Sequence, residues 1–169
     1  WLMALAIFFM FGLGYWMMGL EYYSPYYHSA PDLHRSVGIV VGLALVFRFL
    51  WRLTNPKPDD GELSPMERYA AKVVHWAFYP LILIIIVSGY LISSSDGRAI
   101  DVFGLFSIPS VVTEKGLSDQ AGYIHKILAY SVIGLALVHA AASLKHHFWD
   151  RSDVLKRMIS GPPKDEKNS

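Results

Sequence analysis

Four long apolar stretches dominate the sequence and constrain what it can fold into. They cover residues 1–20, 34–53, 73–93 and 122–148, and their few charged residues lie close to their ends. A bilayer span requires about 20 mostly apolar residues. The chain has 169 residues, 53% of them hydrophobic, which is too apolar for an ordinary soluble domain. The pattern therefore predicts an all-α fold, an integral membrane four-helix bundle.

The bundle is expected to occupy residues 1–149, followed by a charged tail at 150–169. The third connecting segment, 94–121, begins with a turn signal and then becomes moderately apolar, but it is too short to span. We expect it to lie along the membrane interface over the mouth of the bundle. The chain opens without a basic n-region or a small-residue cleavage site, so no signal peptide is predicted, and the first helix is expected to begin before Trp1.

Basic residues are distributed unevenly between the two sides of the predicted bundle. The second loop, the helix ends beside it and the tail hold eleven of the fifteen lysines and arginines, whereas the first and third loops with their helix ends hold four. Lysine and arginine collect on the cytoplasmic side of membrane proteins. The second loop and both termini are therefore predicted to face the cytoplasm, and the first and third loops to face outward.

Cysteine is absent from the chain. Its absence excludes disulfides, thiolate metal sites and iron–sulfur clusters, and no CxxCH motif exists that could attach haem covalently. Any metal must be held by nitrogen, oxygen or methionine sulfur. No role with nucleic acid is expected.

Two histidines, His125 and His139, lie fourteen residues apart in the last apolar stretch. Fourteen residues make about four helical turns, so both side chains share a face at levels about 21 Å apart. Histidine within a membrane is usually functional, and imidazole is an axial ligand of haem iron. The spacing predicts two haems, one near each membrane face. The alternative is two unrelated polar residues at a helix interface, whose shared face and depth would then be accidental.

The other histidines can be sorted by depth. His34 begins the second stretch at the outer face, level with His125, so we expect these two to bind one iron. His139 needs a partner on the cytoplasmic side, and the candidates are His75 and the residue that precedes Trp1. His75 could instead cap its helix or donate a hydrogen bond to a haem propionate or a quinone.

At the cytoplasmic end of the fourth stretch, His146 and His147 are about 100° apart on a helix, so both cannot bind one metal. We expect them to meet lipid headgroups, or one of them to contribute to a quinone pocket. His28 is expected to be an ordinary loop histidine. Arg48 could either snorkel to the interface or pair with a haem propionate.

Gly38 and Gly42 form a small-xxx-small face on the second stretch. This face predicts either close helix packing or clearance for a macrocycle.

Several segments resemble, in order along the chain, the bacterial cytochrome b561 family. They are APDLHRSVGIVVGLALVFRFLWRL, SGYLISSSDGRAIDVFGLFSIPS, IHKILAYSVIGLALVHAAASLKHHFWD and DVLKRMI. The resemblance implies a four-helix bundle of the bacterial inner membrane that carries two b-type haems. The family is related to the cytochrome b subunits of membrane hydrogenases and formate dehydrogenases. The branch that looks nearest is often encoded beside a small periplasmic isoprenoid-binding protein, which makes such a protein a candidate partner.

The resemblance also implies roles for individual residues. His34 and His125 would bind the outer haem, and His139 the inner one. In the family the fourth ligand is a histidine in a His-Trp pair that opens the first helix, and Trp1 matches that tryptophan, so the ligand would be the preceding residue. The family's quinone site lies near the inner haem, which makes His75 and His146 candidates for contact with ubiquinone.

We therefore expect transmembrane electron transfer through two b haems between a periplasmic donor and the quinone pool. One family activity is the oxidation of superoxide. The outward segments hold six acidic and four basic residues, a formal charge of −2, which does not favour an anionic donor. A local patch around Arg35 and Arg98 could still attract one.

Two alternative functions are considered. One is a cytochrome b anchor and electron conduit for a larger dehydrogenase or hydrogenase, and the other is a small transporter that relays protons or binds a transition metal.

Overall fold

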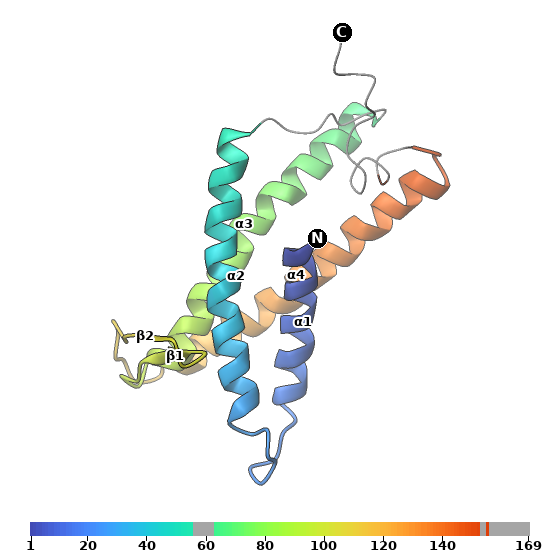
Figure 1. Ribbon diagram of the computed structural model, residues 1–169. Helices are drawn as coiled ribbons and strands as arrows, with labels where there is room; N and C mark the ends of the chain where they lie inside the picture. The colour runs from blue at the N-terminus through green and yellow to red at the C-terminus, as the bar shows by residue number, and fades with distance from the viewer. Residues whose placement is uncertain (56–62, 153–154, 156–169) are drawn as a thin grey trace.

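The computed structural model describes residues 1–55, 63–152 and 155. Four helices and one short hairpin follow in the order α1 (Leu2–Met17), α2 (Ser29–Thr54), α3 (Pro65–Ser94), β1 (Ile100–Val102), β2 (Phe106–Ile108) and α4 (Leu117–Phe148). The connection between α1 and α2 and the hairpin lie toward one end of the molecule, and the end of α2 and the start of α3 lie toward the other (Figure 1). Consecutive helices are therefore antiparallel, as an up-and-down bundle requires.

Three of the helices, α2, α3 and α4, are long and apolar enough to cross a bilayer. The first helix is more apolar than these three but has 16 residues, which corresponds to about 24 Å against a hydrocarbon core of about 30 Å. The helical, membrane-type fold is confirmed, and the fourth complete span over residues 1–20 stays a prediction.

Three helices, α2, α3 and α4, begin earlier than their apolar stretches do. A capping box starts α3: the Ser64 side chain accepts from the backbone N–H of Glu67, and the Glu67 carboxylate accepts from the Ser64 backbone N–H. The polar residues from Pro65 to Lys72, expected to belong to a loop, are thus a helical extension of the third stretch. Similarly, α2 begins at Ser29 and α4 at Leu117, each five residues before its apolar stretch.

The segment between α3 and α4 contains a β-hairpin that was not expected from the sequence. Its strands pair Ile100 with Ile108 and Val102 with Phe106 in antiparallel register. The hairpin lies against the N-terminal part of α2, where the Ser36 hydroxyl accepts from the Phe103 backbone N–H at 3.2 Å. The hairpin thus tethers the third loop to α2 two residues from His34.

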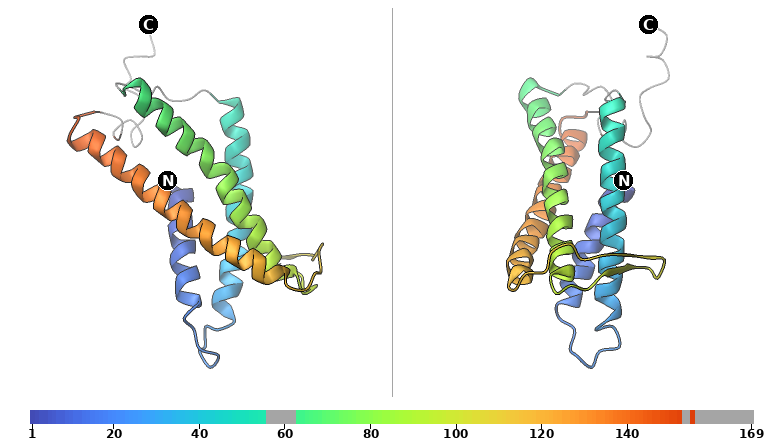
Figure 2. Two further views of the ribbon diagram at one scale, coloured as in Figure 1. Left: turned by 180° about the vertical axis from the view of Figure 1, so that it is seen from behind. Right: turned by 90° about the vertical axis from the view of Figure 1, so that its left-hand side faces the viewer.

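The most extensive contact between helices joins α3 to α4, and α1 meets α4 only sparsely (Figure 2). A small core of Leu45, Ile82 and Val132 connects α2, α3 and α4 at mid-height. Phe11 and Tyr130 make an edge-to-face ring contact between α1 and α4, with centroids 5.2 Å apart. Large apolar side chains are exposed along all four helices, as expected of surfaces that face lipid.

Candidate functional site

The structure brings together the two histidines that were expected to form the outer pair. His34 on α2 and His125 on α4 face one another with ring centroids 6.2 Å apart and planes inclined at 65°. Both side chains are partly buried within the bundle. Two imidazoles from different helices thus meet at one level, toward the end of the bundle that holds the hairpin, as their positions in the sequence predicted.

The ring of His125 is oriented by groups on α3. Its Nδ1 lies 2.9 Å from the carbonyl oxygen of Ile85 and 3.1 Å from the Ser88 hydroxyl oxygen. The Ser88 hydroxyl also donates to the Ile85 carbonyl at 2.9 Å. Because a carbonyl only accepts, Nδ1 carries the proton and Nε2 keeps its lone pair. This is how metal-binding histidines are commonly held in proteins.

The ring of His34 lacks such a support. Within the described residues its Nδ1 is buried and has no hydrogen-bond partner. A buried polar atom without a partner is rare and requires an explanation, such as a bound group that the protein atoms alone do not show. An imidazole that binds a cofactor provides one.

Two glycines give these imidazoles their space. A Cβ atom added to Gly14 on α1 would lie 3.2 Å from Cε1 of His34, and one added to Gly89 on α3 would lie 3.2 Å from Cε1 of His125. Any side chain there would press on the ring. Sequence reasoning did not single out either glycine, because no local pattern shows which helix faces a histidine. Gly38 and Gly42, which it did single out, face Met10 and Ile86 and so serve helix packing.

A second pair lies further along α4. His75 on α3 and His139 on α4 have their Nε2 atoms 3.1 Å apart and their ring centroids 4.8 Å apart. The distance is that of a hydrogen bond, in which one Nε2 donates and the other accepts. Metal–imidazole bonds are about 2.0 Å long, so two nitrogens on opposite sides of one metal would lie about 4 Å apart. The two rings share a level but do not enclose room for an iron between them.

Arg52 on α2 packs against α3, the helix that carries His75. Its guanidinium lies over the rings of Trp76 and Tyr79, with its carbon 5.4 Å and 6.0 Å from their centroids, and its Nε is buried without a hydrogen-bond partner among the described residues. Arg48, the expected propionate partner, has an exposed side chain one turn earlier. Arg52 is therefore the better placed donor, and sequence position alone could not separate the two.

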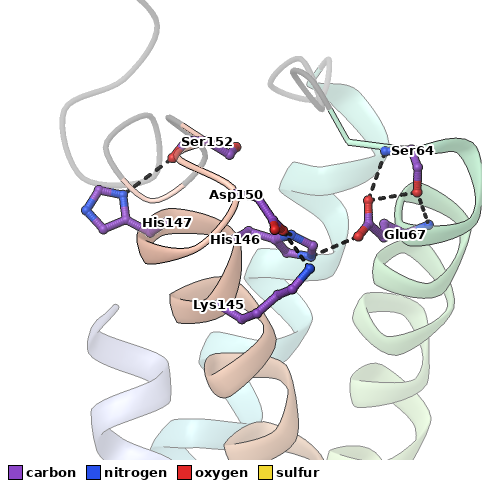
Figure 3. Close-up of polar contacts among 7 residues, drawn as sticks. All are labelled: Ser64, Glu67, Lys145, His146, His147, Asp150 and Ser152. Carbon is purple, nitrogen blue, oxygen red and sulfur yellow. Dashed lines mark hydrogen bonds and ion pairs between the residues drawn. The ribbon is translucent and has the colours of Figure 1, made fainter.

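The histidines at the end of α4 point in different directions (Figure 3). Nδ1 of His146 lies 2.7 Å from Oδ2 of Asp150, and its Nε2 lies 3.7 Å from Oε1 of Glu67. His147 faces the Ser152 backbone oxygen at 3.4 Å. The site of His146 is separate from the inner pair, because seven residues, or about 10 Å of helix, divide His146 from His139.

His28 is exposed in the first loop, where its ring contacts that of Tyr27. On the same side of the molecule, each of the two arginines expected to attract an anion forms an ion pair with an aspartate. Arg35 pairs with Asp32, and Arg98 pairs with Asp96. The Arg98 guanidinium holds the pKa of Asp96 below its ordinary value. The candidate patch around Arg35 and Arg98 is thus largely neutralised by its own neighbours.

The donor set fits b-type haem. The outer level offers two imidazoles from opposite helices, one with its lone pair preserved by a fixed hydrogen bond and one with an orphaned buried nitrogen. The inner level offers His139 beside His75, and Arg52 of α2 packs on Trp76 and Tyr79 of α3. Apolar helices around both levels would enclose a flat, hydrophobic macrocycle. Imidazole ligands in such surroundings are those of b-type cytochromes.

Comparison with known proteins agrees with this geometry. A family model described as prokaryotic cytochrome b561 matches residues 1–161. A protein of Escherichia coli strain K12 named cytochrome b561 homolog 2 is 47% identical over 161 residues, which cover 94% of this chain and 86% of the relative. A Yersinia pestis protein named probable superoxide oxidase CybB is 33% identical over 131 residues, which cover 75% of this chain and 73% of the relative.

Proposed function

The chain belongs to the prokaryotic cytochrome b561 family, a family of membrane proteins that carry b-type haem, and from this membership we propose a specific role. The protein holds two b haems and transfers electrons across the bacterial inner membrane between a periplasmic donor and the quinone pool. The observation that carries the proposal is the pairing of histidines at two levels of α4, His34 with His125 and His75 beside His139.

Each bound haem supplies a one-electron iron couple whose potential depends on its axial ligands and surroundings. At the outer level His34 and His125 are the proposed ligands. The Ile85 carbonyl and the Ser88 hydroxyl fix the ring of His125, and a fixed ring needs little reorganisation when the charge of the site changes.

At the inner level His139 is the proposed ligand. A second protein ligand for that haem would come from outside the α3–α4 pair, because His75 and His139, with their Nε2 atoms 3.1 Å apart, leave no room for an iron between them. His75 then serves as a hydrogen-bonding neighbour of the inner site. Arg52 is a proposed partner for a propionate, since its guanidinium lies over the Trp76 ring of α3 and its buried Nε lacks a hydrogen-bond partner among the described residues.

Quinone reduction is proposed at the inner end, with protons taken from the cytoplasm. A quinone that accepts two electrons also takes up two protons. His75 is the proposed contact, because imidazole can donate and accept protons near neutral pH. His146, which was expected beside it, lies about 10 Å of helix beyond His139 and is not part of this proposed contact. The excess of basic residues on the second loop and tail supports the cytoplasmic orientation of this end.

Two classes of electron donor are considered for the outer side, a small anion and a larger protein. Superoxide is one candidate, since one relative is named a probable superoxide oxidase. The pairing of Arg35 with Asp32 and of Arg98 with Asp96 speaks against strong electrostatic attraction of an anion. A larger periplasmic partner, such as an isoprenoid-binding protein, stays a prediction.

Reconstitution in quinone-containing liposomes tests this role directly. The full-length protein should show a reduced b-type spectrum on addition of quinol, and should reduce quinone when a donor is supplied from the outer side. Failure of the haem to equilibrate with quinol would contradict the proposal. Purification in mild detergent completes the test, because a stoichiometric dehydrogenase or hydrogenase subunit would instead identify the chain as a membrane anchor.

A further inference from the structure

A cavity of about 290 Å³ lies where the start of α3 meets the end of α4. Glu67, Lys145, His146 and Asp150 are among the residues that line it (Figure 3). Ligand atoms of Glu67, His146 and Asp150 all lie within 4.8 Å of one another. Two elements that are far apart in the sequence thus present an imidazole and two carboxylates to one small volume.

The distance between the side chains of Glu67 and His146 is informative. Nε2 of His146 and Oε1 of Glu67 are 3.7 Å apart, which is too long for a hydrogen bond. Zinc binds imidazole nitrogen and carboxylate oxygen at about 2.1 Å with tetrahedral angles, which places two such ligands about 3.4 Å apart. The observed gap is therefore close to that of two ligands on one ion.

The other atom of each ligand is already held. Oε2 of Glu67 accepts from the backbone N–H of Ser64 at 3.0 Å and from its hydroxyl at 2.7 Å, which leaves Oε1 for the cavity. Nδ1 of His146 donates to Oδ2 of Asp150 at 2.7 Å, so Nε2 keeps its lone pair toward Glu67. A carboxylate that fixes a histidine in this way is a usual support of zinc sites.

The local charge also suits a cation. Glu67 and Asp150 each contribute one negative charge, and Lys145, whose ammonium donates to Oδ2 of Asp150 at 2.7 Å, contributes one positive charge. With a neutral imidazole the cluster carries a net charge of −1. Imidazole and carboxylate together suit zinc and its neighbours in the transition series.

We propose that Glu67 and His146 bind a divalent transition-metal ion of the zinc class, with Asp150 as the residue that positions His146. The ion joins the start of α3 to the end of α4. It is distinct from the haem-binding levels, and its binding does not depend on the function proposed above.

Titration with Zn²⁺ tests the site on the full chain, purified with haem in detergent and with any polyhistidine tag removed. Isothermal titration calorimetry is expected to show one ion per chain, and zinc K-edge absorption one imidazole ligand. Glu67→Gln keeps the capping box, since glutamine also serves at that position, and is expected to weaken binding at least tenfold. His146→Ala should weaken it as much or more, and Asp150→Asn by about tenfold.

His147→Ala is the matched control, because His147 is adjacent in sequence but faces Ser152. It should bind zinc as the wild type does. Circular dichroism and the haem spectrum check that each variant is folded. The proposal is overturned if the wild type binds no zinc, if Glu67→Gln binds within twofold of the wild type, or if His147→Ala loses as much affinity as His146→Ala.

Discussion

The Nε2 atoms of His75 and His139 lie 3.1 Å apart across the interface of α3 and α4. Each Nε2 uses its proton or its lone pair in this hydrogen bond, so His139 would have to release His75 before the same nitrogen could bind an iron. We therefore propose His139 as the ligand and His75 as its neighbour, and substitutions of these two residues are expected to have different effects.

His139→Ala is expected to remove the inner haem, whereas His75→Ala is expected to retain it and to change its potential and its reaction with quinone. The measurement is the reduced-minus-oxidised spectrum with haem quantitation and a redox titration. If a folded His75→Ala protein lacks the inner haem, His75 is itself the second axial ligand.

Gly14→Ala should weaken the outer haem. The added methyl group would lie 3.2 Å from Cε1 of His34, so the ring must shift by a few tenths of an ångström. Overpacking of this kind costs about 1–3 kcal/mol, or roughly 5- to 150-fold in affinity if all of it falls on haem binding. Gly12→Ala on the same helix is the control, because a Cβ at Gly12 has nothing within 4 Å. Equal haem affinity in the two variants would show that Gly14 does not set the position of His34.

Ser88→Ala should loosen the ring of His125. The hydroxyl contacts both Nδ1 and the Ile85 carbonyl, and loss of an outer hydrogen bond at a metal-binding histidine typically lowers affinity 10- to 100-fold. Competition with apomyoglobin would measure the effect on the outer haem. Ser131→Ala removes a similar hydroxyl that donates to Ile127 on the exposed side of α4, and should leave haem affinity unchanged. An unchanged Ser88→Ala protein would mean that the Ile85 carbonyl alone orients His125.

Asp150 gives the end of α4 a defined dependence on pH. Hydrogen bonds from Lys145 and then from His146 hold the pKa of its carboxyl below the ordinary value of about 3.9. A lowered pKa means that the carboxylate stabilises the folded end fully above the ordinary value, and that this contribution is lost as pH falls through the lowered value. Lys145→Met should therefore raise the pKa of Asp150, measured by the NMR shift of its carboxyl carbon. A pKa that does not move would show that Lys145 has little influence on it.

The depths of the histidines along the bundle could be predicted from the sequence because they depend on hydropathy and residue spacing. Hydropathy located the apolar stretches, and the fourteen-residue spacing placed His125 and His139 on one face of one helix. The pairing of His34 with His125 followed from depth alone, and the structure confirms that they meet. The depth of a residue in the membrane follows from its position along its apolar stretch, and that position is read directly from the sequence.

Contacts that depend on the rotation of one helix against another could not be predicted. Gly14 and Gly89 face histidines on other helices, and Arg52 rather than Arg48 turns toward α3. The contact of Glu67 with His146 joins helix ends 79 residues apart, and the polar start of α3 had been assigned to a loop. The hairpin was missed because its apolar residues resemble those of an interfacial segment.

The haem content of the full-length protein and of its His125→Ala variant tests the central claim most directly. Pyridine haemochrome quantitation should give two non-covalent b haems per chain in the wild type and one in the variant, with the inner haem largely unperturbed, since His139 lies four turns away. His28→Ala, a loop histidine on the same side, should keep both. Loss of both haems from a folded His125→Ala bundle, or a single haem in the wild type, would contradict the account.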